Sequence, residues 1–157
     1  MVQVGEDEWD TEIKERIFPE RRRRAPLPDA QFLPYKIENI YQETFLALNQ
    51  GQRILAGIGI RALIEAICNN RKVTGTLEKM INKLVVSNAL RQAEADILHK
   101  MRFMGNEAAH KTSALSENSL SLAFDIVEHL LVNVFLLEKR AKELPDRKKV
   151  VPKRAEV

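Results

Sequence analysis

The sequence is poor in the residues that interrupt or cross-link a chain, because its 157 residues include six glycines, six prolines and one cysteine. A single cysteine excludes an internal disulfide. Cys68 lies in the apolar stretch IEAIC, so we expect a buried, unreactive thiol there. Glycine-rich hairpin turns and period-two alternation are also lacking, which argues against β-strands.

Long apolar runs are missing as well. No uncharged apolar run reaches the 18 residues that a membrane span needs. The first residues, MVQVGEDEWDTEIKE, are acidic and lack the basic start and apolar run of a secretory signal. We therefore expect a cytoplasmic protein without membrane contact.

Motifs for cofactors and metals do not occur. The sequence has no phosphate-binding loop, dinucleotide motif or nucleophile elbow. His99 and His110 lie eleven positions apart, and no cysteine or carboxylate completes a ligand set. His129 and Asp125 form an ordinary pair one helical turn apart. We therefore expect neither a metal nor a cofactor.

The formal net charge of +3 comes from the ends of the chain. Residues 1–20 carry −5, residues 21–24 carry +4 and residues 139–157 carry +5, which leaves −1 for residues 25–138. The basic flanks are expected to be mobile and solvated, with contact to nucleic acid or an acidic partner as the alternative. The charge therefore does not indicate a basic binding face on the core.

Proline placement predicts the domain boundaries. Four of the six prolines lie between Pro19 and Pro34, and the other two follow residue 144. We expect an acidic then basic, partly disordered segment at residues 1–32, one helical domain at residues 33–144 and a basic disordered tail at residues 145–157.

Apolar residues in the central part recur every three to four positions, which is typical of amphipathic helices. Pro34 suits a helix start, Gly51 a stop and Thr76 an N-cap. The predicted fold is an all-α bundle of about five helices with a long C-terminal helix. The expected helices span about 34–49, 52–70, 77–84, 89–109 and 116–143.

The expected second helix is apolar on nearly every side, which predicts a central position. Its exceptions, Arg61 and Glu65, stand one turn apart on the same side. A charged pair inside a bundle is tolerated when it is matched or faces a cavity. We expect either an internal salt bridge or the border of a polar pocket.

The fourth helix carries a polar stripe opposite an apolar one. At 100° per residue, Arg102, Asn106, His99 and His110 fall within about 80° of one another. The stripe has no carboxylate, and this set of side chains suits anions and proton transfer. An ordinary polar helix face is the alternative to a pocket near Arg61 or Glu65.

Large apolar residues interrupt the polar side of the last helix. Val132, Phe135 and Leu136 fall within or beside the arc that contains Asp125 and His129. A soluble monomer rarely exposes such a cluster, so we predict a homodimer. Packing against the N-terminal helix of the same chain is the alternative.

Three stretches in order, IRALIEAI, LEKMINKLV and ILHKMRFMGNEAAH, resemble the domain-of-unknown-function 4145 family, which is HEPN-like. The upstream stretches IFPE and LPYKIENIYQETFLAL extend the similarity, which covers most of residues 17–137. A cysteine-rich zinc module often precedes the domain in relatives. This chain lacks that module and resembles the helical part alone.

The resemblance implies an all-helical bundle, often paired with a second copy, in proteins fused to or encoded beside prokaryotic defence enzymes. Some HEPN members are metal-independent ribonucleases whose dimer brings together an arginine and a histidine from each subunit. Arg102 and His110 match those residues, although seven residues separate them here, a longer spacing than usual, so Asn106 would take part. An imidazole can move the ribose 2′-hydroxyl proton and a guanidinium can hold the phosphate without a metal.

We therefore expect a noncatalytic helical interaction or dimerisation module of a prokaryotic defence or restriction-type system, whose partner is a second copy or a defence or restriction enzyme subunit. The alternatives are a dimeric ribonuclease acting on RNA and a nucleotide-sensing domain. The near-neutral core disfavours RNA binding, which relies on phosphate neutralisation. The catalytic candidates are Arg102, Asn106 and His110, and the candidates that line a pocket are His99, Arg61 and Glu65.

Overall fold

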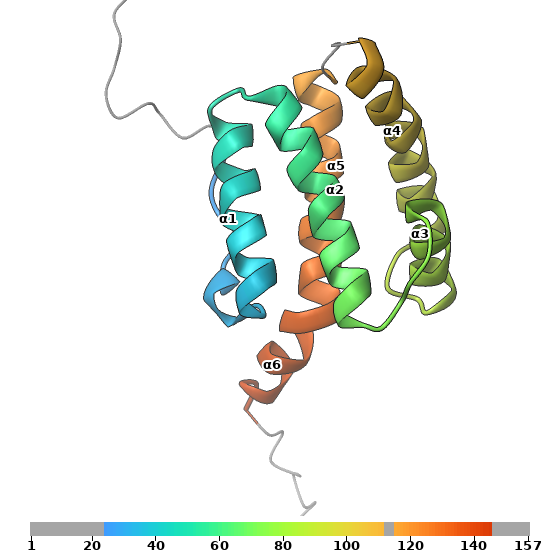
Figure 1. The fold of residues 1–157 in the computed structure, drawn as a ribbon. Coiled ribbons are helices and arrows are strands. Elements are labelled where there is room, and N and C mark those ends of the chain that lie inside the picture. Colours follow the sequence, from blue (N-terminus) through green and yellow to red (C-terminus); the bar gives the residue numbers. More distant parts are fainter. Residues whose placement is uncertain (1–23, 112–114, 146–157) are drawn as a thin grey trace, which may run out of the picture.

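The computed structural model describes residues 24–111 and 115–145, with residues 102–111 as backbone only, and every regular element in those ranges is helical. The predicted all-α bundle of five helices with a long C-terminal helix is confirmed (Figure 1). The elements are η1 (Ala30–Phe32), α1 (Tyr35–Asn49), α2 (Arg53–Asn70), α3 (Leu77–Val86), α4 (Gln92–Lys111), α5 (Glu117–Leu131), η2 (Val132–Leu136) and α6 (Leu137–Lys142). The last three, α5, η2 and α6, form the one long C-terminal helix.

Local sequence signals fix several helix ends. The hydroxyls of Thr76 and Ser116 accept hydrogen bonds from the backbone N–H groups three residues on, at 3.4 and 3.1 Å, and so cap α3 and α5. Gly51 follows the C-cap of α1 and has a φ of 70°, a left-handed conformation that glycine adopts without steric cost. The short turn it forms makes α1 and α2 antiparallel neighbours (Figure 1).

The buried core extends from α1 and α2 across α5 to α3 and α4, which lie on the other side of α5 from α1 (Figure 1). The rings of Tyr41 and Phe124 stack with their centroids 5.6 Å apart and join α1 to α5. Aliphatic side chains fill the remaining space, among them the fully buried Leu63, Ile67 and Leu130. Their burial supplies most of the driving force for the bundle.

The long C-terminal helix contains one π-helical turn, η2, between α5 and α6. The N–H of Leu137, the residue that follows η2, donates to the carbonyl of Val132, five residues back. The turn keeps Leu136 fully buried at the end of the core. Periodicity predicted the extent of this helix but not the π turn, which is rare and leaves little trace in the sequence.

By length and apolar composition, one helical stretch of the described residues, Glu117–Lys142, could cross a membrane. The same stretch supplies Leu120, Phe124 and Val127 to the centre of the bundle. Core helices meet the same criterion, because burial on several sides also requires a long apolar sequence.

Helices α1 and α2 are in close contact at Gly59. A Cβ atom added at Gly59 would lie 2.9 Å from the Cβ of Thr44, a side chain that is only 2% exposed. A Cβ atom added at Gly57, two residues earlier, would meet Leu120 at an ordinary 3.7 Å. The two glycines therefore differ in how much space surrounds them.

We expect Gly59→Ala to lower the free energy of unfolding by about 1–3 kcal/mol, because the new methyl group overpacks the α1–α2 contact. Gly57→Ala should leave stability unchanged or raise it by up to about 1 kcal/mol, the helix propensity gain of alanine over glycine. Urea unfolding followed by circular dichroism measures both. Equal effects of the two substitutions would contradict the close contact at Gly59.

Candidate functional site

The three candidate catalytic residues lie on the C-terminal half of α4. The backbone of α4 is helical through Lys111, so Arg102, Asn106 and His110 follow one another at intervals of four residues on one helix. Four residues are slightly more than one turn of an α-helix, so the three positions lie on the same side of α4. Their side chains lie outside the described residues, and their convergence into a pocket therefore stays a prediction.

His99, one turn before this segment, contacts α3. Its Nε2 lies 2.9 Å from Oδ1 of Asn82 and forms a hydrogen bond between the two helices. With the ring proton on Nε2, the bond leaves Nδ1 as an acceptor, and this buried atom has no partner among the side chains that the structure describes. His99 thus joins α4 to α3.

Arg61 and Glu65 form the predicted ion pair, but on the outside of the bundle. The Nε of Arg61 lies 2.9 Å from Oε1 of Glu65, and the two side chains are 56% and 39% exposed. The expectation of an internal salt bridge is therefore wrong. It failed because α2 packs against its neighbours on one side and leaves this side open.

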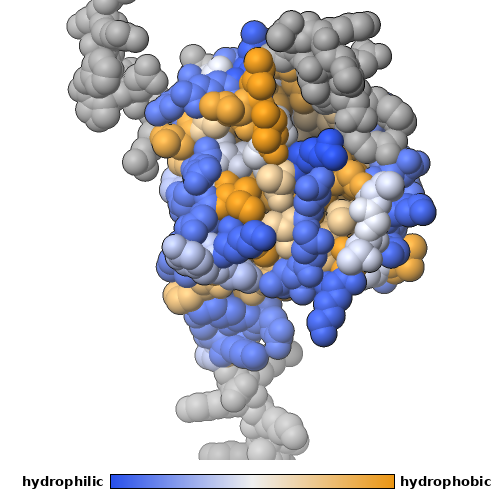
Figure 2. All heavy atoms as spheres, viewed as in Figure 1, coloured by the Kyte–Doolittle hydropathy of each residue, from blue (hydrophilic) through white to orange (hydrophobic). Residues whose placement is uncertain are grey.

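The open side of α2 also exposes three large aliphatic residues. Ile54, Leu55 and Ile58 are 56%, 55% and 60% exposed. At 100° per residue they fall within about 100° of the helix circumference. Figure 2 shows apolar side chains reaching the surface on the side of the molecule that includes α2. We call these three residues, with Arg61 and Glu65, the outer face of α2.

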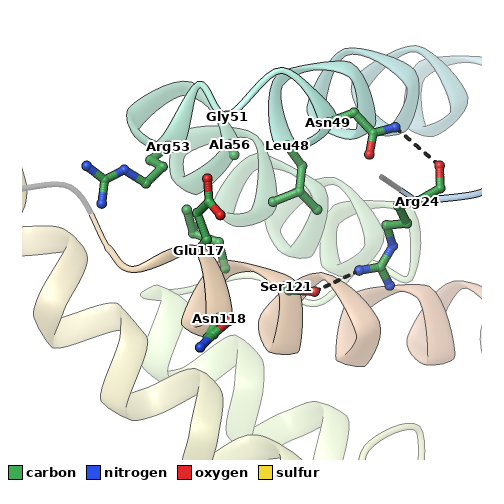
Figure 3. A pocket seen from close by; sticks show the side chains of 10 residues that line it. Arg24, Leu48, Asn49, Gly51, Arg53, Ala56, Glu117, Asn118 and Ser121 are labelled. Carbon is green, nitrogen blue, oxygen red and sulfur yellow. Dashed lines mark hydrogen bonds between the residues drawn. The ribbon is translucent and has the colours of Figure 1, made fainter. Parts of the chain in front are cut away.

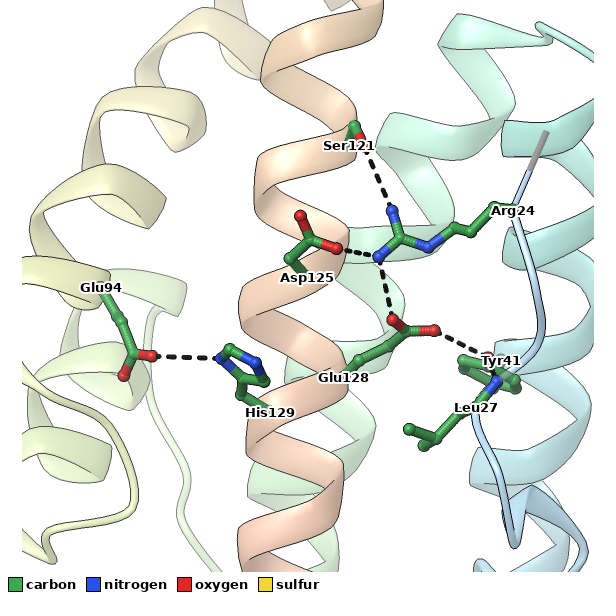
Figure 4. A network of polar contacts seen from close by, with 8 residues as sticks. All are labelled: Arg24, Leu27, Tyr41, Glu94, Ser121, Asp125, Glu128 and His129. Carbon is green, nitrogen blue, oxygen red and sulfur yellow. Dashed lines mark hydrogen bonds and ion pairs between the residues drawn. The ribbon is translucent and has the colours of Figure 1, made fainter.

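A polar network joins the segment before α1 to α5 (Figure 4). The guanidinium of Arg24 donates to Ser121 Oγ at 3.2 Å and to Glu128 Oε2 at 2.9 Å, and it also pairs with Asp125. It lies 5.0 Å from the centroid of the Phe124 ring, within cation–π range. The predicted solvation of the arginine run therefore does not hold for Arg24, which is 20% exposed.

Tyr41 extends this network into the core. Its hydroxyl donates to Glu128 Oε1 at 2.8 Å and accepts from the backbone N–H of Leu27 at 2.6 Å. Burial raises the pKa of Tyr41 well above its ordinary value, and the neighbouring carboxylate of Glu128 adds to the rise. The phenol consequently stays protonated and acts as a hydrogen-bond donor within the fold.

The C-terminal helix differs from its prediction in two contacts. His129 pairs with Glu94 of α4, Nδ1 to Oε1 at 3.7 Å, and Asp125 pairs with Arg24, so the expected His129–Asp125 pair does not form. The cluster that motivated the homodimer is also covered. Leu136 is fully buried, and Val132 and Phe135 are partly buried against the core. This helix therefore gives no support for a dimer, which stays a prediction.

A cavity of about 240 Å³ lies beside Arg24, between the α1–α2 turn and the start of α5 (Figure 3). Arg53 and Glu117 contribute charged groups to its lining, and Asn118 and Ser121 contribute polar ones. Ligand pockets commonly hold about 300–1,000 Å³, so this cavity is small for one. Within the described residues, no group of three His, Cys, Asp or Glu side chains is arranged to hold a metal ion.

Comparison with known protein families identifies the family to which the central and C-terminal parts of the chain are similar. Residues 42–147 match the family described as Domain of unknown function (DUF4145). No curated protein and no solved structure matches the chain.

We expect Arg24→Gln to lower the free energy of unfolding by about 1–3 kcal/mol, because Asp125 and Glu128 lose the cation between them in a partly buried setting. Lys142→Gln removes a more exposed ion pair, that with Glu138, and should cost less than about 0.5 kcal/mol. Chemical denaturation of both variants measures the difference. A smaller loss for Arg24→Gln than for Lys142→Gln would contradict a structural role of the network.

Proposed function

The chain belongs to the DUF4145 family, and because the description of that family names no function, we propose one from the surface of the molecule. The protein is a noncatalytic helical interaction module of HEPN-like type that pairs with a second copy through the outer face of α2. We place this module in a prokaryotic defence or restriction-type system, where a defence or restriction enzyme subunit would bind the pair.

The exposure of Ile54, Leu55 and Ile58 is the observation that carries the proposal. Each side chain is about half exposed, so covering the remainder contributes on the order of 1 kcal/mol per side chain. Two copies would cover six such side chains, a gain of several kcal/mol. This gain offsets part of the loss of translational and rotational freedom on association.

Charge on the same face favours a second copy as the occupant. The outer face of α2 carries one cation, Arg61, and one anion, Glu65, both exposed and one turn apart. In a two-fold pairing each surface meets its own copy, so a face that carries both signs can match itself. A strongly basic or acidic partner would meet like charge at one of the two residues.

The segment of α4 that carries Arg102 and His110 lies at the same end of the bundle as the exposed aliphatic residues of α2. The N-terminal end of α2 and the C-terminal end of α4 lie at the same end of the bundle (Figure 1). Leu115, the residue before the N-cap of α5, lies 4.0 Å from a Cβ atom placed at Gly57, so the start of α5 also lies at this end of α2. Pairing through α2 would therefore bring the segment of α4 that carries Arg102 and His110 near the partner copy.

Sedimentation velocity at micromolar concentration tests the pairing. We expect a species of twice the 18.0 kDa of one chain, and a shift to 18.0 kDa for Ile58→Asp, because a carboxylate would be buried between the copies. Val86→Asp is the matched control, since Val86 is 83% exposed on α3, and it should remain dimeric. A monomeric wild-type protein would rule out the proposal.

A metal-independent ribonuclease is the second candidate, favoured by the unbroken helical backbone of α4 through Arg102, Asn106 and His110. The two candidates differ in their outcome with mixed RNA in the presence of a chelator. We expect no cleavage from the interaction module. Cleavage that is lost in Arg102→Ala and His110→Ala, and retained in His129→Ala, would replace it with the ribonuclease.

A further inference from the structure

A groove of about 870 Å³ lies where the end of α2, the α3–α4 connection and the π turn η2 meet. Arg71 follows α2, residues 87–91 join α3 to α4, and Val132, Asn133 and Val134 of η2 form the remaining wall together with nearby residues of α6. This volume is within the range of sites for small molecules. The groove is separate from the outer face of α2, since the two share no residue.

The cations of this groove outnumber its anions. Arg71, Arg91 and Arg140 line it, against the single carboxylate of Glu94. Glu94 is already engaged, because it lies 3.7 Å from His129 and accepts from the backbone N–H of Arg91 at 2.9 Å.

One of the three arginines has its own counter-ion. Arg140 pairs with Asp29 at 3.0 Å and also donates to the carbonyl of Pro28 at 3.0 Å. The guanidinium groups of Arg71 and Arg91 have no carboxylate partner among the residues that the structure describes. The lining of the groove thus includes two arginines without a carboxylate partner in the described part of the chain, and the planar donor pairs of a guanidinium match the oxygens of a phosphate.

The backbone that forms the walls of the groove is irregular, but its N–H groups are hydrogen-bonded. Asn88 turns the chain between α3 and α4 with a φ of 58°, and the N–H groups of Ala89 and Leu90 bond back to the carbonyl of Leu84 at 2.9 and 3.2 Å. The opposite wall includes the π turn, an arrangement found frequently at functional sites. A preformed wall lowers the ordering cost of binding a ligand.

We infer that this groove binds a small ligand that carries a phosphate or diphosphate group. Arg71 and Arg91 bind the phosphate oxygens, and the amides of Asn88 and Asn133 supply donors and acceptors for the rest of the ligand. Apolar side chains in the lining, including Val134, accept its less polar part. The inference does not rest on the pairing of α2.

Isothermal titration calorimetry of the full chain with inorganic pyrophosphate, in a buffer free of phosphate, tests the site. We expect saturable binding that weakens at least about tenfold in Arg71→Gln and in Arg91→Gln, since each loses charge-assisted hydrogen bonds. Lys36→Gln removes one exposed positive charge from α1 and should bind pyrophosphate as the wild-type chain does. Circular dichroism verifies that each variant is folded.

A second arm of the experiment separates a free phosphate from a lipid headgroup, using vesicles that contain phosphatidic acid. If the chain binds the vesicles but not pyrophosphate, and the double variant Arg71→Gln/Arg91→Gln loses this binding, the result supports the same site with a lipid headgroup as the phosphate that it binds. The inference is overturned if neither probe binds, or if Lys36→Gln weakens binding as much as the groove variants do. The latter result would show attraction to net charge rather than to a site.

Discussion

Helix α2 is packed against its neighbours along one side, and the rest of the structure depends on that contact. Gly59 lets the backbone of α2 approach Thr44 of α1, and Leu63 and Ile67 are fully buried in the core that α1, α2 and α5 share. Because these neighbours occupy only one side, the opposite side of the helix has no cover from the described chain. The exposure of Ile58 and its apolar neighbours is thus a consequence of how the bundle closes, and the proposed pairing uses this side of α2.

Arg24 fixes the chain that precedes the bundle onto α5. Its guanidinium lies between the carboxylates of Asp125 and Glu128 and over the ring of Phe124. Glu128 in turn accepts from Tyr41, whose raised pKa keeps the donating proton in place. The polar side of α5 is therefore matched within the chain. This match explains why α5 can combine a buried apolar side with carboxylates that are themselves partly buried.

Much of the fold could be predicted from the sequence, because helical periodicity and caps are local properties. The start of α3 at Thr76 and the stop at Gly51 follow from single residues. The contacts of Arg24 could not be predicted, since they join residues about one hundred positions apart. The exposed side of α2 could not be predicted for another reason. A helix that is apolar on all sides does not indicate which side lacks a neighbour. Within the candidate site, spacing placed Arg102, Asn106 and His110 on one helix, while Arg61 and Glu65 proved to face outwards.

The molecule thus presents two surfaces of different chemistry, an apolar face on α2 and an arginine-lined groove at the end of the same helix. The central claim is that the first surface pairs with its own copy. Cysteine cross-linking tests that claim most directly, because the chain has a single native cysteine, Cys68, and it is fully buried. Mild oxidation of Ile58→Cys is predicted to give a disulfide-linked dimer on a non-reducing denaturing gel, while Val86→Cys stays monomeric. The account is contradicted if Ile58→Cys stays monomeric or if both variants cross-link to the same extent.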